Sequence, residues 1–183
     1  MPTHRSPPDE AQLMAVRDAV RAELQDLSAF LERSTLLTLP KASLGKLRGL
    51  DAATYFPVHE AAEALCDQAR FEEALPLALY LMVHEPGHQP FNFLAASCLH
   101  RLGHLHEAAE LYASAVNGGP DDAIALFRLG ECLETSQRRK QAREAYEAAL
   151  DVSRDNADLW QLQDWAMARS HALNHTQESQ HER

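Results

Sequence analysis

Residues 91–115 read FNFLAASCLHRLGHLHEAAELYASA, and this stretch decides the fold. Apolar residues recur every three or four positions on both sides of Gly103. That pattern predicts two helices, residues 89–102 and 105–117, with a turn between them. Small side chains such as Ala96 allow the two helices of a hairpin to approach closely. The stretch therefore predicts one helical hairpin.

The hairpin pattern recurs with a period of 34 residues from Tyr55 to Asn156. The positions that repeat are Leu65, Leu99 and Leu133; Ala74, Ala108 and Ala142; Phe93 and Phe127; Cys98 and Cys132; Tyr112 and Tyr146; Pro86 and Pro120. These columns resemble the tetratricopeptide repeat, in which small residues, an aromatic and a terminal proline recur at such offsets. Each repeat of this kind buries its apolar face against its neighbours.

The sequence thus predicts an all-α fold of three tandem tetratricopeptide repeats, preceded by a helical extension and followed by a capping helix. A stacked array needs such a cap to cover its last apolar face. The predicted boundaries are 1–54 for the extension with its hinge, 55–88, 89–122 and 123–156 for the repeats, 157–173 for the capping helix, and 174–183 for a flexible polar tail.

The extension is predicted to contain one amphipathic helix that starts near Asp9. Its apolar stripe consists of Leu13, Val16, Val20, Leu24, Leu27 and Leu31. This stripe packs either on the first repeat or on another chain. Residues 34–50, which include Pro40, predict a hinge and one short helix. Pro76 predicts that the second helix of the first repeat starts late or is kinked.

Charge and hydropathy exclude several classes of partner. The 183 residues carry a formal net charge of −10, and residues 1–54 contribute nothing to it because they hold seven basic and seven acidic side chains. An acidic surface repels phosphate backbones, so no nucleic-acid partner is expected. The longest apolar run, residues 74–83, has 10 residues, about half of what a membrane span needs. With no apolar core of a signal peptide near the N-terminus, a cytoplasmic protein that does not insert into membranes is predicted.

The repeat spacing also predicts a binding groove. The first helix of each hairpin lines the concave side of a repeat stack. On this chain that surface is aromatic in the middle and acidic at its ends, which suits an extended peptide held by pockets and polar groups. Its predicted residues are Phe56, His59, Glu63, Cys66, Pro90, Phe91, Phe93, Ser97, His100, Arg101, Ile124, Phe127, Glu131 and Glu134. Phe93 and Phe127 either line this groove or pack between repeats.

The sequence predicts neither catalysis nor a cofactor. It contains no nucleophile elbow, phosphate-binding loop or dinucleotide glycine pattern. His171 and His175 have a spacing that could share a metal on one helical face, but they lie near a chain end without matching ligands, so no metal site is predicted. The cysteines form no CxxC pair. They are expected to be reduced and to pack as small core residues.

A three-repeat array with a helical extension, one capping helix and an acidic balance resembles the class II chaperones of bacterial type III secretion, which bind pore-forming translocator proteins. The matching segments are FEEAL at residues 71–75, residues 91–115 as quoted above, and LFRLGECLE at residues 126–134. The resemblance implies an ATP-independent chaperone in the bacterial cytoplasm. Such a protein would keep hydrophobic translocators soluble before secretion, because exposed membrane-inserting segments aggregate.

The resemblance also implies details of the contacts. The groove would hold an extended N-terminal client segment, with Phe71 as a further aromatic of the first repeat, and the N-terminal stripe would form a homodimer or contact the client. The family often has aromatics where this chain has His59, Glu63 and Cys66, which leaves the peptide specificity open. Two alternatives stand beside this hypothesis. One is a general repeat adaptor in another bacterial pathway, and the other is an enzyme or metalloprotein that uses the histidines.

Overall fold

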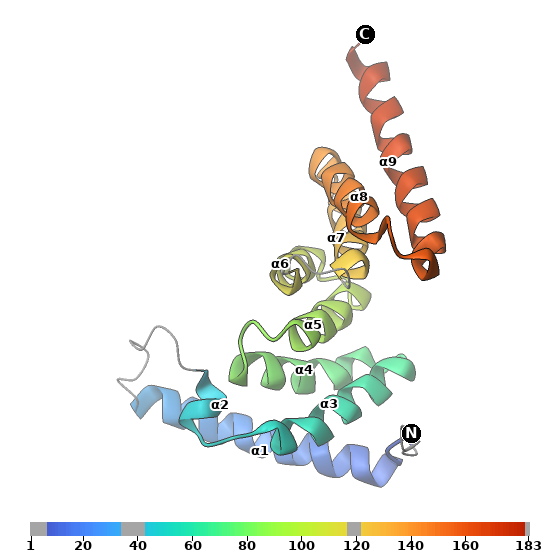
Figure 1. Cartoon of the computed structure of the whole chain (residues 1–183). Coiled ribbons are helices and arrows are strands. Elements are labelled where there is room, and N and C mark those ends of the chain that lie inside the picture. The colour runs from blue at the N-terminus through green and yellow to red at the C-terminus, as the bar shows by residue number, and fades with distance from the viewer. Residues whose placement is uncertain (1–6, 34–42, 117–121, 182–183) are drawn as a thin grey trace. The chain divides into compact units, whose positions relative to one another are not determined.

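The computed structural model describes residues 7–33, 43–116 and 122–181, and within these ranges the chain forms helices and turns without a strand (Figure 1). The helices are α1 (Glu10–Arg33), α2 (Leu44–Leu47), α3 (Ala52–Asp67), α4 (Phe71–His84), α5 (Gln89–Arg101), α6 (Leu105–Ala115), α7 (Ala123–Thr135), α8 (Arg139–Ser153), the 3-10 helix η3 (Ala157–Leu159) and α9 (Trp160–His181). The all-α prediction is confirmed. The chain forms two compact units, unit 1 as far as Cys98 and unit 2 from Leu99 onward.

The same turn closes the first helix of all three repeats. Ala69, Gly103 and Gln137 lie 34 residues apart, and each has a positive φ, of 58°, 86° and 61° respectively. The amide of the next residue donates across the turn to the carbonyl of the repeated leucine, for example from His104 to Leu99 at 2.9 Å. This arrangement is the left-handed helix stop known as a Schellman motif. The 34-residue period is therefore a period of backbone geometry as well as of side chains.

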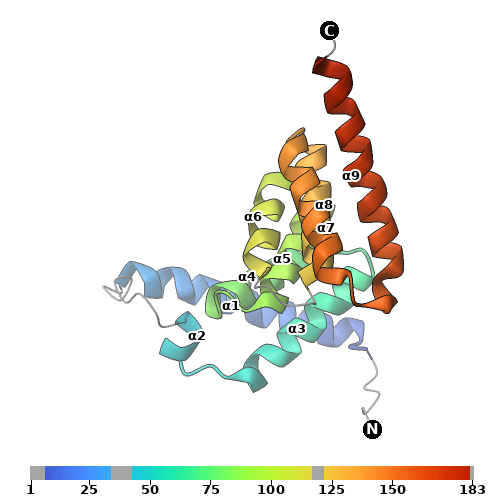
Figure 2. The ribbon, with the colours of Figure 1, turned by 45° about the horizontal axis from the view of Figure 1, so that its top comes forward.

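Helix α1 packs along α3 and α4 within unit 1, as Figures 1 and 2 both show. It starts with a reciprocal cap, in which the amide of Gln12 donates to the Asp9 carboxylate at 2.8 Å and the amide of Asp9 donates to the Gln12 side chain at 2.9 Å. Leu13 and Val20 of the predicted stripe are each 3% exposed. The stripe therefore packs on the first repeat, one of the two alternatives that the sequence left open.

Val16 and Leu24 of the stripe are half-buried. The side chains of Leu27 and Leu31 lie outside the described residues. Among the described stripe residues, Val16 and Leu24 can meet another chain without unpacking unit 1. A homodimer through the stripe stays a prediction.

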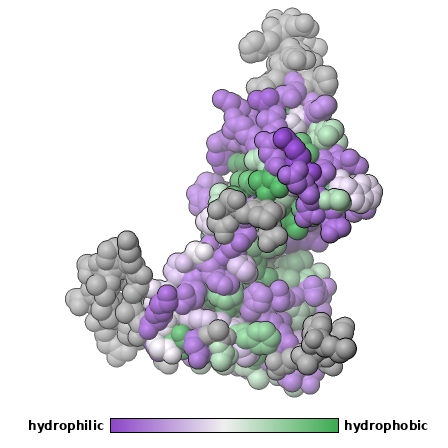
Figure 3. All heavy atoms as spheres, in the orientation of Figure 1, coloured by the Kyte–Doolittle hydropathy of each residue, from purple (hydrophilic) through white to green (hydrophobic). Residues whose placement is uncertain are grey.

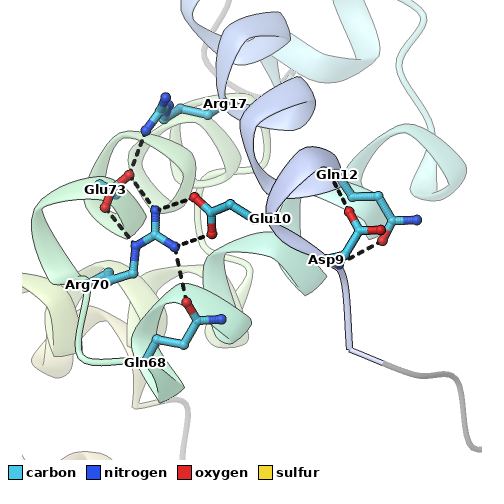
Figure 4. Close-up of polar contacts among 7 residues, drawn as sticks. All are labelled: Asp9, Glu10, Gln12, Arg17, Gln68, Arg70 and Glu73. Carbon is cyan, nitrogen blue, oxygen red and sulfur yellow. Dashed lines mark hydrogen bonds and ion pairs between the residues drawn. The ribbon is translucent and has the colours of Figure 1, made fainter.

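An ionic network holds the start of α1 against α4 (Figure 4). Arg70 contacts Glu10 of α1 at 2.6 Å and Glu73 of α4 at 2.7 Å, and Glu73 also pairs with Arg17 of α1 at 2.6 Å. The Arg70 guanidinium lowers the pKa of both carboxyl groups by donating hydrogen bonds to them. Both ends of the first half of α1 are thus tied to the first repeat.

Side-chain caps set the starts of α2 and α3. Ser43 accepts a hydrogen bond from the amide of Lys46, and Asp51 accepts one from the amide of Thr54. The predicted short helix within residues 34–50 is confirmed as α2. Because of the Asp51 cap, α3 begins at Ala52, earlier than the predicted repeat boundary at residue 55.

Two of the helices in unit 1 contain a proline beyond their first turn. Pro57 lies inside α3 and Pro76 inside α4. Since α4 already begins at Phe71, the second helix of the first repeat does not start late. The helical run continues through Pro76, although proline cannot donate its backbone hydrogen bond there.

Unit 2 has its core between α7, α8 and α9. The Phe127 ring lies 5.4 Å from that of Tyr146 and 6.4 Å from that of Trp165, measured between centroids. The Tyr146 hydroxyl donates to Glu134 at 2.8 Å, and Arg169 of α9 contacts the same carboxylate at 3.2 Å. Helix α9 covers α8 as a cap, as the sequence predicts for the end of a repeat array.

The C-terminal segment corrects the prediction of a flexible tail. Helix α9 runs to His181, well beyond the predicted end of the capping helix at Leu173. Residues 157–183 contain no glycine or proline, and their many Gln, Glu, Ala and Arg residues favour helix. A polar segment can still be helical.

The described helices include none that is both long and apolar enough to cross a lipid bilayer. On the face drawn in Figure 3, hydrophilic residues cover much of the coloured surface of each unit. Among the side chains that the structure describes, the exposed large apolar ones are Met14, Phe56, Val83, Ile124, Trp160, Trp165 and Met167.

Candidate functional site

An apolar pocket of about 500 Å³ opens in unit 1 beside the first repeat. Helices α2, α3 and α5 and the loop before α5 build it. Its lining consists of Lys46, Leu50, Asp51, Tyr55, Phe56, His59, Glu85, His88, Pro90 and Phe91. Aromatic and imidazole rings thus make up half of the lining, with an ammonium and two carboxylates beside them. Such a mixture suits an apolar side chain whose backbone is held by polar groups.

The rings of this pocket are organised around Phe91. The Phe91 ring is 4.0 Å from that of His88, 5.5 Å from that of His59 and 6.1 Å, edge-on, from that of Tyr55, between centroids. Phe91 is 7% exposed and Tyr55 6%, whereas Phe56 is 53% exposed. Phe91 and Tyr55 are therefore the fixed floor of the pocket, and Phe56 is its accessible aromatic.

The structure brings together four of the residues predicted for the groove: Phe56, His59, Pro90 and Phe91. Glu63 lies one helical turn further along α3, where its carboxylate is 3.3 Å from the His59 ring. Cys66 is half-buried and meets Cys98 rather than the pocket.

Three further residues of unit 1 that were predicted for the groove lie away from this pocket. Phe71, Phe93 and Ser97 are half-buried, and each makes contacts within the chain. None of them lines the pocket that Phe56 and Phe91 form. For Phe93, both alternatives from the sequence, groove and packing, remain predictions.

The predicted residues of unit 2 have varied surroundings. His100 lies edge-on to Tyr112 at 6.0 Å, and burial lowers its pKa. Ile124 is 43% exposed and Arg101 is exposed. Glu131 pairs with Arg128 at 2.7 Å. A groove that continues from unit 1 into these residues stays a prediction.

Phe127 packs in the interior of unit 2. It is 6% exposed and packs against the rings of Tyr146 and Trp165. Of the two alternatives for this residue, the structure therefore favours packing.

Several pocket residues were absent from the sequence prediction: Lys46, Leu50, Asp51, Tyr55, Glu85 and His88. Lys46, Leu50 and Asp51 lie before the first predicted repeat, in a segment that repeat spacing cannot place because it occurs once in the chain. Glu85 and His88 lie between α4 and α5, outside the first helix of a repeat. The Asp51-x-x-Thr54 cap was the one local signal that marked part of this region.

In the described part of the chain, no group of three or more His, Cys, Asp or Glu side chains is arranged to hold a metal ion. The side chain of His175, which is four residues from His171, lies outside the described residues.

Comparison with known protein families identifies the repeats. Residues 59–122 and residues 102–166 each match a family described as "Tetratricopeptide repeat". The human and mouse "Protein O-mannosyl-transferase TMTC3" are 43% identical over 56 residues, which is 31% of this chain and 6% of theirs. The chain therefore spans only a small fraction of the length of these curated relatives.

Solved structures share a larger part of the fold. A chain from a type III secretion system complex of Aeromonas hydrophila superposes with a TM-score of 0.70 at 16% identity, over 84% of this chain and 98% of that one. The type III secretion translocator chaperone SycD of Yersinia enterocolitica gives 0.63 at 15% identity, over 72% and 98%. SycD in complex with a peptide of the translocator YopD gives 0.65 at 15% identity, over 69% and 97%. At these identities the superpositions show a common fold.

Proposed function

The chain is built from tetratricopeptide repeats, and from that premise we propose that it is a type III secretion chaperone. It binds the hydrophobic translocator proteins in the bacterial cytoplasm and keeps them soluble before secretion. Binding, without ATP or chemistry, is sufficient for this task, because masking an apolar segment prevents its aggregation. The observation that carries the proposal is the extent of the structural match. At 84% of this chain and 98% of the neighbour, it reaches beyond the repeats at residues 59–166.

The pocket supports a mode of binding. An extended N-terminal client segment places an apolar side chain against Phe56 and the floor formed by Tyr55 and Phe91. Lys46 and Asp51 lie at the same pocket and are available to the backbone or to polar side chains of the client. Binding of this type depends on a few anchor side chains rather than on the total area.

Co-expression tests the function. The chain is produced together with a candidate client, a long protein with membrane-spanning segments from the same bacterium, and the client is measured in the soluble fraction. We expect the client to be soluble only in the presence of the chain. If the client remains insoluble or degraded regardless of the chain, the chaperone function is rejected.

A substitution then tests the pocket separately from the function. Phe56→Glu replaces the accessible aromatic ring with a carboxylate. It is expected to weaken the affinity for the client at least tenfold, since a single anchor side chain can contribute more than about 1.4 kcal/mol to binding. Val83→Glu is the matched control, because Val83 is also an exposed apolar residue of unit 1 (38%) but lies outside the pocket. A client that binds both variants equally well would leave the chaperone function standing and reject the pocket.

The homodimer is part of the same proposal. The half-buried Val16 and Leu24 are its proposed contacts, since the deeper stripe residues are occupied within unit 1. Light scattering on the purified chain is expected to give twice the monomer mass, and Val16→Glu is expected to give the monomer. A monomer for the unaltered chain over the whole accessible concentration range would refute this contact.

A general repeat adaptor remains the second candidate. The observation that favours it is the 43% identity to a repeat segment of a long, otherwise different protein, because it shows how much of this sequence is ordinary repeat pattern. An adaptor would recover folded partners from its native host, whereas a translocator chaperone would recover proteins with membrane-spanning segments. Mass spectrometry of the co-purified proteins distinguishes the two.

A further inference from the structure

Two cysteines from different repeats face each other in unit 1. Cys66 near the end of α3 and Cys98 in α5 place their Sγ atoms 3.4 Å apart, although they are 32 positions apart in the chain. A disulfide bond is about 2.05 Å long. The two sulfur atoms are thus within about 1.4 Å of bonding distance, a gap that small side-chain rotations can close.

The third cysteine provides an internal comparison. Cys132 is the repeat equivalent of Cys98, and the residue equivalent to Cys66 is His100. The second repeat therefore offers the imidazole of His100 where the first repeat offers the thiol of Cys66. Cys132 is fully buried, and burial raises its pKa to about 11. The thiol pair is thus a feature of one place in the fold and not a consequence of the repeat.

The two thiols of the pair differ in access and acidity. Cys66 is half-buried and Cys98 is fully buried. The Cys98 thiol donates a hydrogen bond that stabilises the Cys66 thiolate, which lowers the pKa of Cys66 against the opposing effects of burial, Asp67 and Glu63. The same bond, together with burial, raises the pKa of Cys98. Cys66 is consequently the nucleophile and Cys98 the resolving thiol.

We propose that Cys66 and Cys98 are a redox modification site, which low-molecular-weight disulfides such as oxidised glutathione convert reversibly into an intramolecular disulfide. The site joins α3 to α5 within unit 1. It does not depend on the proposed chaperone function, because it rests only on the position of the two thiols.

The reaction has two exchange steps. The Cys66 thiolate attacks one sulfur of the small disulfide, whose S–S bond breaks, and one molecule of the small thiol leaves after taking up a proton. Cys98 then loses its proton and attacks the Cys66 sulfur of the mixed disulfide, which expels the second small thiol. Two protein thiols are oxidised and one small disulfide is reduced to two small thiols.

The test equilibrates the full-length chain in glutathione buffers of increasing oxidising strength, followed by acid quenching and alkylation. We expect one alkylated cysteine, Cys132, in place of three, and an intact mass lower by two hydrogens before alkylation. Trypsin cuts after Arg48, Arg70 and Arg101, so the linked cysteines lie in two peptides, 49–70 and 71–101. These peptides are expected to run as one species until a reductant is added.

Three variants define the outcome. Cys132→Ser leaves the pair in place and is expected to close as the unaltered chain does. Cys98→Ser is expected to stop at a glutathione adduct on Cys66, and Cys66→Ser is expected to leave Cys98 unmodified. The helical signal in circular dichroism confirms that each variant is folded. The proposal is overturned if Cys66 and Cys98 stay fully alkylatable at the most oxidising poise. It is equally overturned if the unaltered chain accumulates the adduct without linking the two peptides.

Discussion

The Tyr55 hydroxyl packs against α2 at a local cost in free energy. The Tyr55 hydroxyl is buried and has no hydrogen-bond partner within the described residues. It lies so close to α2 that a Cβ atom at Gly45 would be 1.6 Å from the hydroxyl oxygen and 2.9 Å from Cζ. An unpaired buried hydroxyl is unfavourable, so close packing of α2 is what keeps it there.

This contact predicts a coupled pair of substitutions. Tyr55→Phe removes the unpaired hydroxyl and is expected to leave stability unchanged or to raise it by about 1 kcal/mol. Gly45→Ala is expected to cost about 1–3 kcal/mol, because the new methyl group displaces α2. The double variant should recover part of that loss, because Tyr55→Phe removes the hydroxyl oxygen, which is the atom closest to the new methyl group. Urea unfolding of the four proteins measures the coupling, and strictly additive effects would contradict the contact.

His84 is a fully buried imidazole between two partners. Its Nδ1 lies 2.8 Å from the carbonyl oxygen of Tyr80, and its Nε2 lies 2.9 Å from the guanidinium of Arg48. A guanidinium only donates, so the ring is neutral, with Nε2 as acceptor and the proton on Nδ1. Arg48 also contacts Glu23 of α1 at 2.8 Å. One imidazole thereby connects α4 with the residues that hold α1.

The stability of unit 1 is expected to fall on acidification. Burial, with Arg48 adding to it, lowers the pKa of His84 in the folded chain below its ordinary value. The unfolded chain therefore binds more protons, and stability is lost as the pH falls below about 6.5. Hydrogen exchange of α4 peptides between pH 7.5 and pH 5.5, corrected for intrinsic rates, should show loss of protection. His84→Gln keeps an uncharged polar side chain and should flatten this dependence. An equally steep loss in His84→Gln would assign it to other groups.

At the scale of elements, the helix stops of the three repeats form a natural series. Ala69 and Gln137 adopt a left-handed backbone that glycine adopts in the second repeat at Gly103. Such a conformation costs a residue with a Cβ atom roughly 1–2 kcal/mol. Two of the three turns therefore store strain that the third avoids.

This series predicts gains and a loss of stability at equivalent positions. Ala69→Gly and Gln137→Gly are each expected to raise the free energy of unfolding by about 0.5–1 kcal/mol, after the entropy cost of glycine in the unfolded chain. Gly103→Ala should lower it by about 1 kcal/mol. Thermal unfolding of the three variants tests the series. A gain for Gly103→Ala would show that the turns do not share one energetic origin.

The repeat made these turns predictable, whereas the extent of the helix that follows the repeats was not. The column of Leu65, Leu99 and Leu133 recurs because the same hydrogen bond closes each turn. The length of α9 was missed because polar residues signal exposure and say little about backbone conformation. The length of a helix that lies outside the repeats cannot be predicted from the 34-residue period.

In the candidate site, too, repeat spacing predicts some of the residues and misses the others. Phe56, His59 and Phe91 follow from repeat spacing, whereas Lys46 and Leu50 reach the pocket through the docking of α2. The Cys66–Cys98 contact joins positions that are not equivalent in the repeat, so no column of the sequence indicated it. Contacts between repeats depend on how the hairpins stack, and the spacing within one repeat does not contain that information.

For the whole molecule, charge is the dominant long-range property. The formal net charge of −10 belongs entirely to residues 55–183. Repulsion among like charges destabilises a compact state. Some attractive pairs are exposed on both sides, as between Arg154 and Asp151, and such pairs contribute little. The sum of the charge–charge interactions in the folded chain should therefore be repulsive.

Salt is expected to stabilise the chain. Raising NaCl from about 10 mM to about 150 mM shortens the screening length from roughly 30 Å to roughly 8 Å, which weakens the distributed repulsion more than the short ion pairs. At pH 8 we expect the thermal midpoint to rise by a few degrees, about 1 kcal/mol in a domain of this size. A variant with Glu72→Gln, Glu107→Gln and Glu144→Gln lowers the negative charge at exposed positions and should gain less. Arg70→Gln should gain more, because it adds to the net charge and removes the network that salt would weaken. A midpoint that falls with salt would mean that ion pairs such as Arg70–Glu10 outweigh the net charge in holding this fold together.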